Sequence, residues 1–206
     1  MPDLDFSQLF ALGEGLRRTA LRAHREAPWP AAADLLLGRH RPDAPVEFRR
    51  DSGSRPMDLV GTTAVAIKLV SERFVAALSA AGARGWGTYP VRLLDRAGTE
   101  VPGYAGLAVT SRAGPLDRGR TRVVALPPVG PGLPVSYEER GMYFAPASWD
   151  GADVFVPEGT TAVCVTDRVR RALTAAGATN LDFVPLSHHL MNLHSAPPPG
   201  VPVADD

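Results

Sequence analysis

A short sequence occurs twice in this chain of 206 residues, and the repetition limits the folds that the chain can adopt. The residues Gly-Thr-Thr-Ala-Val occupy positions 61–65 and recur at 159–163. These two segments are 98 residues apart (159 − 61), and after them the match runs at a constant offset of 95 residues (166 − 71), which aligns Ser71 with Thr166. In both copies an apolar, β-branched segment leads to an N-cap residue, a stretch with helical spacing and a glycine. The sequence therefore predicts two related strand, helix, strand units.

The matched positions are those that shape a helix and its ends. An acidic residue, Glu72 or Asp167, follows each cap and favours the helix N-terminus through the helix dipole. Apolar residues then recur three and four apart, so each helix should press one stripe onto a sheet. The matched pairs further along are Arg73 and Arg168, Leu78 and Leu173, Ala81 and Ala176, Gly82 and Gly177, Ala83 and Ala178, and Pro90 and Pro185. Because two copies are too few for a solenoid, we predict an α+β fold in which the two units form either a pair of related half-sheets packed together or one continuous mixed β-sheet.

The first 55 residues are predicted to form an N-terminal helical segment. From 5 to 26, apolar residues such as Phe6, Leu9 and Phe10 recur at helical spacing while arginines occupy the other positions, which indicates an amphipathic helix with a basic outer face. Pro30 suits the first turn of a second short helix, which Gly38 should end. The predicted organisation is therefore 1–55 helical, 56–110 first unit, 111–194 connection and second unit, and 195–206 a disordered, proline-rich tail.

Further strands are indicated by β-branched and aromatic composition. We expect one strand over 60–70 and another over 89–94, followed by a turn at 95–98 that forms a hairpin with 99–101. Strands are also expected over 104–110 and 122–126. The proline and glycine density of 127–134 predicts an exposed loop.

Composition excludes several classes of partner and site. Acidic and basic residues are equal at 22 each, so no net field recruits nucleic acid or an anionic membrane. The chain has neither a signal-peptide pattern nor an apolar segment long enough to span a bilayer, so we expect it in the cytosol. The one cysteine, Cys164, rules out an internal disulfide and reads as a buried strand residue. No glycine-rich phosphate loop is present, and no cofactor is predicted.

Two sets of residues are candidates for sites of chemistry. Imidazoles at His188, His189 and His194 could together bind zinc or nickel, but neighbours in a strand or helix point in different directions and no carboxylate stands among them. Asp150 and Asp153 could act as paired acids, although their setting fits a turn that leads into a strand. We therefore predict neither a metal site nor a catalytic residue, and an enzyme that uses the histidines remains the alternative.

Several motifs, taken in order, resemble those of bacterial immunity proteins. They are Leu-Val-Ser-Glu-Arg-Phe at 69–74, Tyr-Ala-Gly-Leu-Ala-Val at 104–109, Trp-Asp-Gly-Ala-Asp-Val-Phe at 149–155 and Thr-Asn-Leu-Asp-Phe-Val-Pro at 179–185. The chain is most similar, over about 56–187, to the myxobacterial double-CXXCG motif group of polymorphic toxin systems. It lacks the cysteine pairs that give that group its name, so the resemblance carries over no zinc ribbon.

The resemblance implies a protein that is not an enzyme and that binds and neutralises a cognate bacterial toxin. A surface of this kind needs aromatic or arginine anchors and complementary charge. The candidate contact residues are Trp29, Trp86, Tyr137, Glu138, Glu139 and Tyr143. An intracellular scaffold that recognises another protein is a further alternative. No nucleic acid or membrane is expected among the partners.

Overall fold

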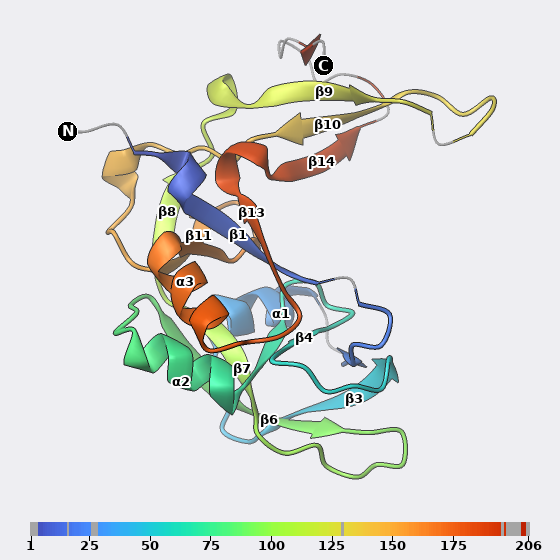
Figure 1. Cartoon of the computed structure of the whole chain (residues 1–206), viewed down its shortest axis with the longest axis vertical. Coiled ribbons are helices and arrows are strands. Elements are labelled where there is room, and N and C mark those ends of the chain that lie inside the picture. The colour runs from blue at the N-terminus through green and yellow to red at the C-terminus, as the bar shows by residue number, and fades with distance from the viewer. Residues whose placement is uncertain are drawn as a thin grey trace.

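The protein has a mixed α/β structure in which strands predominate (Figure 1). The computed structural model describes residues 4–15, 17–25, 29–128, 130–194, 196 and 203–204, with the backbone alone for 29–31, 192–194 and 204. Its α-helices are α1 (Trp29–Leu36), α2 (Glu72–Ala80) and α3 (Asp167–Ala175). Its strands are β1 (Leu9–Glu14), β2 (Arg22–His24), β3 (Val46–Ser52), β4 (Leu59–Gly61), β5 (Lys68–Ser71), β6 (Trp86–Leu94), β7 (Tyr104–Val109), β8 (Arg112–Pro115), β9 (Arg122–Leu126), β10 (Ser136–Arg140), β11 (Val154–Glu158), β12 (Cys164–Thr166), β13 (Leu181–Pro185), β14 (Leu190–His194) and β15 (Val203–Ala204).

The strands form three sheets. Six strands lie in the order β2-β3-β6-β7-β5-β4, five in the order β13-β1-β12-β11-β8, and four in the order β14-β10-β9-β15. Figure 1 shows α2 and α3 next to each other in the middle of the molecule, where they are in contact, and the four-stranded sheet at one end. The fold is therefore assembled from sheets, and the helices cover only part of their surface.

Helix α2 begins and ends where the sequence supplies the appropriate residues. The Ser71 hydroxyl accepts a hydrogen bond from the Phe74 amide at 3.2 Å, which satisfies one free donor of the first turn. Gly82, just beyond the helix, has a φ of 59°, a conformation that a residue with a side chain rarely adopts. Helix α3 ends in the same way at Gly177, with a φ of 64°. Thr166 occupies the N-cap position of α3 but makes no capping bond there.

At the offset of 95 residues β7 corresponds to β1, so we take the first half of the chain to end before β7 and the second half to begin with it. Each of the two larger sheets then contains one strand from the other half. Strand β1 pairs with β12 and β13, whereas β7 pairs with β5 and β6. The registers correspond at the offset of 95 residues, since Leu9 faces Thr166 and Tyr104 faces Ser71. A destabilising substitution in one half of the chain should therefore affect both sheets.

The largest apolar core lies between these two sheets. It contains residues of both halves at corresponding positions, including the pairs Leu12 and Leu107, Leu59 and Val154, Val70 and Val165, Phe74 and Val169, and Leu78 and Leu173. A second core lies under α1 against β3 and β6, with Phe48 fully buried in it. A third joins the N-terminal segment to the base of the four-stranded sheet through Phe6, Phe144 and Phe155.

The prediction of an amphipathic helix over 5–26 is wrong. A 3-10 turn (Phe6–Gln8) leads into β1, and β2 follows at Arg22–His24. Residues 9–12 are all buried, because Phe10 and Leu12 face one apolar core and Leu9 and Ala11 face another, and a strand covered on both faces shows no polar alternation. Gly13 and Gly15 would each destabilise a helix by about 1 kcal/mol, which argues against a helix here. The prediction followed the helical spacing of the apolar residues instead. Helix α1 does occupy the place of the second predicted helix, and Gly38 beyond it has a φ of 62°.

The strand predicted over 60–70 is interrupted. Strand β4 ends at Gly61, β5 begins at Lys68, and the side chain of Val65 in the loop between them is 69% exposed. The second Gly-Thr-Thr-Ala-Val segment instead follows β11, and Val163 in it is buried. The repeated pentapeptide thus occupies different structural environments in the two halves, although the residues after it correspond.

The predicted strand at 122–126 is β9, and the predicted loop at 127–134 lies between β9 and β10. Of the predicted disordered tail, only residues 196 and 203–204 are described, and the latter two pair in parallel with β9 as β15. Among the helices of the described residues, none combines the length and the apolar character needed to cross a membrane.

Candidate functional site

Three of the six candidate contact residues are consecutive on β10. Tyr137, Glu138 and Glu139 lie in the middle of the four-stranded sheet, between β9 and β14. Tyr137 and Glu138 are half-buried, and a register shift between Glu138 and Glu139 bends the pairing with β14. Because neighbouring side chains of a strand point to opposite faces, these residues divide between the two faces of the sheet.

Glu139 has a structural role. It is 2% exposed, and both of its carboxylate oxygens accept hydrogen bonds from one guanidinium nitrogen of Arg118, at 2.9 and 3.0 Å. A buried carboxylate must be paired in this way, because an unpaired one would cost several kcal/mol, roughly. The ion pair holds the segment before β9 against β10 and so stabilises the four-stranded sheet.

Tyr143 lies in an aromatic cluster at the base of the same sheet. Its ring meets that of Phe6 edge-on, with centroids 5.1 Å apart, and the Arg120 guanidinium lies 4.5 Å above its centre. A cation over an aromatic face is attracted by the ring quadrupole. Arg120 itself is exposed, so the Tyr143 ring orients an arginine side chain at the protein surface.

The end of the sheet that lies away from this base carries exposed apolar side chains. The β9–β10 hairpin, residues 122–140, includes Leu133 and Val135, which are 51% and 39% exposed. Leu190, at the start of β14, is 45% exposed as well, but it pairs with Arg140 at the base end of the sheet. In Figure 1 the loop of the hairpin extends away from the rest of the molecule. The hairpin therefore presents an apolar tip and, at its base, the exposed arginines 118, 120 and 122.

The two tryptophan candidates lie elsewhere. The Trp86 ring nitrogen donates to the Ala83 carbonyl at 3.0 Å, and the ring packs against the largest core, so this residue joins α2 to β6. Trp29 begins α1, and its side chain lies outside the described part of the structure. The six candidates are thus not brought together on one surface.

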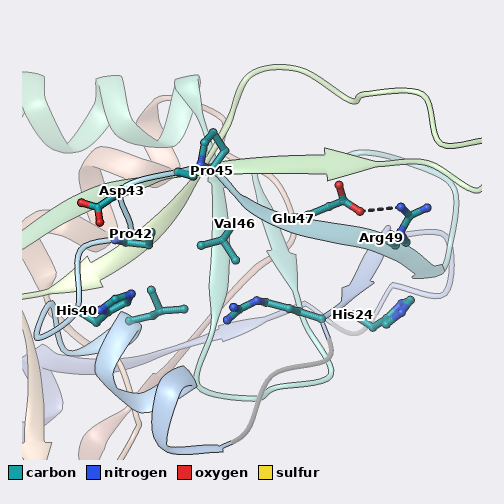
Figure 2. Close-up of a pocket in the computed structure, with 11 residues that line it drawn as sticks. His24, His40, Pro42, Asp43, Pro45, Val46, Glu47 and Arg49 are labelled. Atoms are coloured by element: carbon teal, nitrogen blue, oxygen red, sulfur yellow. Dashed lines mark hydrogen bonds and ion pairs between the residues drawn. The ribbon is translucent and has the colours of Figure 1, made fainter.

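A polar hollow of about 720 Å³ lies at the other end of the fold, where β2, β3 and α1 meet. The pairing of β2 with β3 ends at His24 and Arg49, so the hollow opens over the start of β3. Figure 2 shows His40, Pro42 and Asp43 on one side of it, His24 on the other, and Val46 between them. Glu47 and Arg49 lie on the opposite side of the strand from Val46 and form an ion pair at 2.7 Å. This hollow could not be predicted from the sequence, because its residues come from segments without any motif.

The histidines considered for metal binding are spread over different surroundings. His188 is exposed in a 3-10 turn (Leu186–His188), whereas His189 is half-buried beside Met142 and Met191. Burial lowers the pKa of His189. The side chain of His194 lies outside the described residues. Among the side chains that are described, no group of three or more His, Cys, Asp or Glu residues is placed to hold a metal ion.

The two aspartates considered as paired acids are each engaged in holding the backbone. Asp150 accepts from the Ser111 hydroxyl at 2.7 Å, and this bond is the main reason that the pKa of its carboxyl is lowered. Asp153 accepts from the Arg84 amide at 3.0 Å and from the Thr166 hydroxyl at 3.1 Å. Both contacts tie chain segments that are far apart in sequence, which is a structural task.

Cys164 is fully buried in β12. Burial raises the pKa of its thiol, because the charged thiolate is disfavoured away from water. The thiol lies 3.8 Å from the Met142 sulfur. It therefore behaves as a small apolar core residue.

A scan against models of known protein families and a search of well-characterised proteins gave no match to the chain. The similarity to immunity proteins consequently depends on the motifs alone. Of these, the segment at 69–74 forms the junction of β5 and α2, and the segment at 179–185 leads into β13.

Proposed function

We propose that this protein is an immunity protein, which binds a cognate bacterial toxin in the cytosol of the cell that makes it and blocks the toxin without catalysing a reaction. The observation that carries the proposal is the projecting β9–β10 hairpin, with Leu133 and Val135 exposed at its tip. Single exposed apolar residues are common on protein surfaces. Two of them on one projecting loop form a group that a partner can cover.

The composition of the loop suits it to binding. Its sequence from 127 to 134 is Pro-Pro-Val-Gly-Pro-Gly-Leu-Pro, with four prolines in eight residues. Each proline fixes one backbone dihedral, so less conformational entropy is lost when the loop is held by a partner. Affinity can then be gained from a small contact area.

The charge at the base of the hairpin indicates the kind of surface that the toxin presents. Arg120 is held over the Tyr143 ring, and Arg122 is exposed two residues further along the chain. Tyrosine and arginine are enriched among residues that dominate binding energies. We expect an apolar patch on the toxin for the hairpin tip, with acidic residues at its edge that pair with these arginines.

We also propose that the halves of the fold are copies of one ancestral strand, helix, strand unit. The support is the reciprocity of their contacts. The Asp58 carboxylate accepts from the Thr179 amide at 2.8 Å, and Asp153, 95 positions later, accepts from the amide of Arg84, 95 positions before Thr179. Arg73 and Arg168 face the same two aspartates at 3.6 and 3.7 Å. The hairpin lies outside the repeated elements, where a partner-specific surface can change without disturbing the scaffold.

The proposal is tested with the toxin encoded by the neighbouring gene. Co-expression of the full chain should restore growth to cells that produce the toxin, and the purified proteins should form a complex measurable by calorimetry. The double substitution Leu133→Asp with Val135→Asp should weaken binding by about a hundredfold, since two central apolar contacts are lost and charge is introduced.

Val65→Asp is the matched control, because Val65 is also an exposed valine in a loop but lies between β4 and β5. It should leave protection and binding unchanged. The absence of both a neighbouring toxin gene and rescue would contradict the proposal. If Val65→Asp and the hairpin variant weakened binding equally, the assignment of the surface to the hairpin would be wrong.

A further inference from the structure

Three polar groups near α1 are buried and have no hydrogen-bond partner within the described part of the chain. They are Nη1 of Arg25, Nε of Arg50 and the hydroxyl of Tyr89. All three can donate a hydrogen bond. A buried donor without a partner loses its interaction with water and gains nothing in return, which makes it costly for the folded protein. Of the three, Arg25 also lines a hollow, where a bound acceptor would satisfy its guanidinium.

The strand register places these groups on one face of the six-stranded sheet. Arg50 faces Ala23 across the β2–β3 pair, and Arg25 follows two residues after Ala23, on the same side. On β6, Tyr89 lies four residues before Leu93, which pairs with Phe48 of β3 on that same side. This is the face that α1 covers, and Tyr89 and Phe48 belong to the core beneath it.

Arg25 also lines the hollow at the edge of this face. The hollow has His24 and His40 on its two sides (Figure 2), and both imidazoles can donate to a ligand. Two acidic residues, Asp43 and Glu47, also line the hollow. Glu47 is paired with Arg49 at 2.7 Å and with Arg92 at 4.0 Å, so its charge is compensated within the protein. Asp43 stands on the same side as His40.

We propose that this hollow binds the phosphate group of a small organic phosphate, with the guanidinium of Arg25 as its principal ligand and His24 and His40 at its edges. A phosphate oxygen accepts the planar donors of arginine well, and several donors can bind one phosphate together. The volume of about 720 Å³ is within the range of small-molecule sites, so the group attached to the phosphate has room as well.

The state of Tyr89 is consistent with this assignment. Burial raises the pKa of its hydroxyl, and the nearby positive charge of Arg25 opposes the shift only in part. The phenol therefore stays protonated at neutral pH and is available as a donor.

The test is calorimetric titration of the full chain with inorganic phosphate and, separately, with adenosine monophosphate. We expect saturable binding, tighter for the organic phosphate. Arg25→Gln should weaken binding by at least about tenfold, because a charge-assisted hydrogen bond is lost. His40→Gln, on the other side of the hollow, should weaken it by a smaller factor.

Arg92→Gln is the matched control. Arg92 is an exposed arginine on β6 and its pairing partner Glu47 lies on the opposite side of β3 from Val46. It should leave the affinity unchanged. Thermal unfolding of each variant without ligand shows whether it is folded, and Arg25→Lys, which keeps the charge, should retain part of the binding. Lack of saturable binding to the unmodified chain would overturn the proposal. So would equal weakening by Arg25→Gln and Arg92→Gln, the result expected of an adventitious ion on surface arginines.

Discussion

Asp58 and Asp153 occupy corresponding positions in the two halves of the chain, and most of their contacts are alike. Each is 7% exposed, and each carboxylate bonds the hydroxyl of the residue before a helix, Ser71 for Asp58 and Thr166 for Asp153. Each also accepts from a backbone amide of the other half and faces an arginine of its own helix. The fold therefore holds its two halves together twice, with one set of interactions at each junction.

The two junctions differ in the number and length of these bonds. Thr179 gives Asp58 a second bond through its hydroxyl, at 2.7 Å, where the corresponding Arg84 has no hydroxyl to offer. The Ser71 hydroxyl bonds Asp58 at 2.6 Å and also caps α2, whereas Thr166 bonds Asp153 at 3.1 Å and caps nothing. The junction at Asp58 should therefore contribute more to stability than the junction at Asp153.

The halves differ more in what is added to them. The six-stranded sheet continues beyond β6 into β3 and β2, where the hollow lies, while the five-stranded sheet continues beyond β11 into β8. The hairpin belongs to a third sheet. Both candidate surfaces thus lie outside the elements that correspond at the offset of 95 residues.

The largest expected effect is in the core that the halves share. Leu78 of α2 and Leu173 of α3 are 1% and 0% exposed in the same apolar cluster. Leu78→Ala and Leu173→Ala should each lower the free energy of unfolding by about 3 kcal/mol, because each leaves a cavity of similar size. Urea unfolding followed by circular dichroism measures this. If one substitution cost less than about half of the other, the halves would not share the core equally.

A smaller and unequal effect is expected at the junctions. Asp58→Asn should lower the free energy of unfolding by about 2–3 kcal/mol, since the amide group would face the donors of Thr179 with a donor of its own. Asp153→Asn removes fewer and longer bonds and should cost about 1–2 kcal/mol. The same urea titrations apply. Equal costs would show that the extra hydroxyl of Thr179 does not strengthen its junction.

The helices after Ser71 and Thr166 could be predicted from sequence because their signals are local. A cap residue, an acidic first turn, apolar spacing and a terminal glycine all lie within about ten residues. The course of 5–26 could not be predicted in the same way. Leu9, Phe10 and Leu12 form a strand only because β12 and β13, from the far end of the chain, flank them on both sides. The spacing of apolar residues within 5–26 carries no information about that strand pairing.

The candidate sites show the same limit. Tyr137, Glu138 and Glu139 were chosen for their residue types, and their common strand follows from their being consecutive. The burial of Glu139 depends on Arg118, 21 residues away, and no pattern in the sequence announces that ion pair. The hollow joins residues of β2, the segment after α1 and β3, which the antiparallel pairing of β2 with β3 brings together. Sites made by long-range pairing leave no spacing to recognise.

The smallest expected effect is a change with pH in the stability that the Asp58 junction contributes. Burial alone would raise the pKa of Asp58, but the hydrogen bonds from Ser71 and Thr179, with the charge of Arg73, outweigh burial and lower it. A carboxyl whose pKa is lower in the folded state stabilises the protein above its unfolded pKa of about 3.9, and this contribution is lost as the pH falls through the folded value. The stability advantage of the unmodified chain over Asp58→Asn should therefore be constant from pH 7 to about 5 and shrink below about pH 4. Urea midpoints measured at each pH test this, and comparison with the variant cancels the titration of other acids such as Asp150. An advantage that stayed constant down to pH 3 would mean that the charge of Asp58 contributes nothing, and that its junction is held by the geometry of the hydrogen bonds alone.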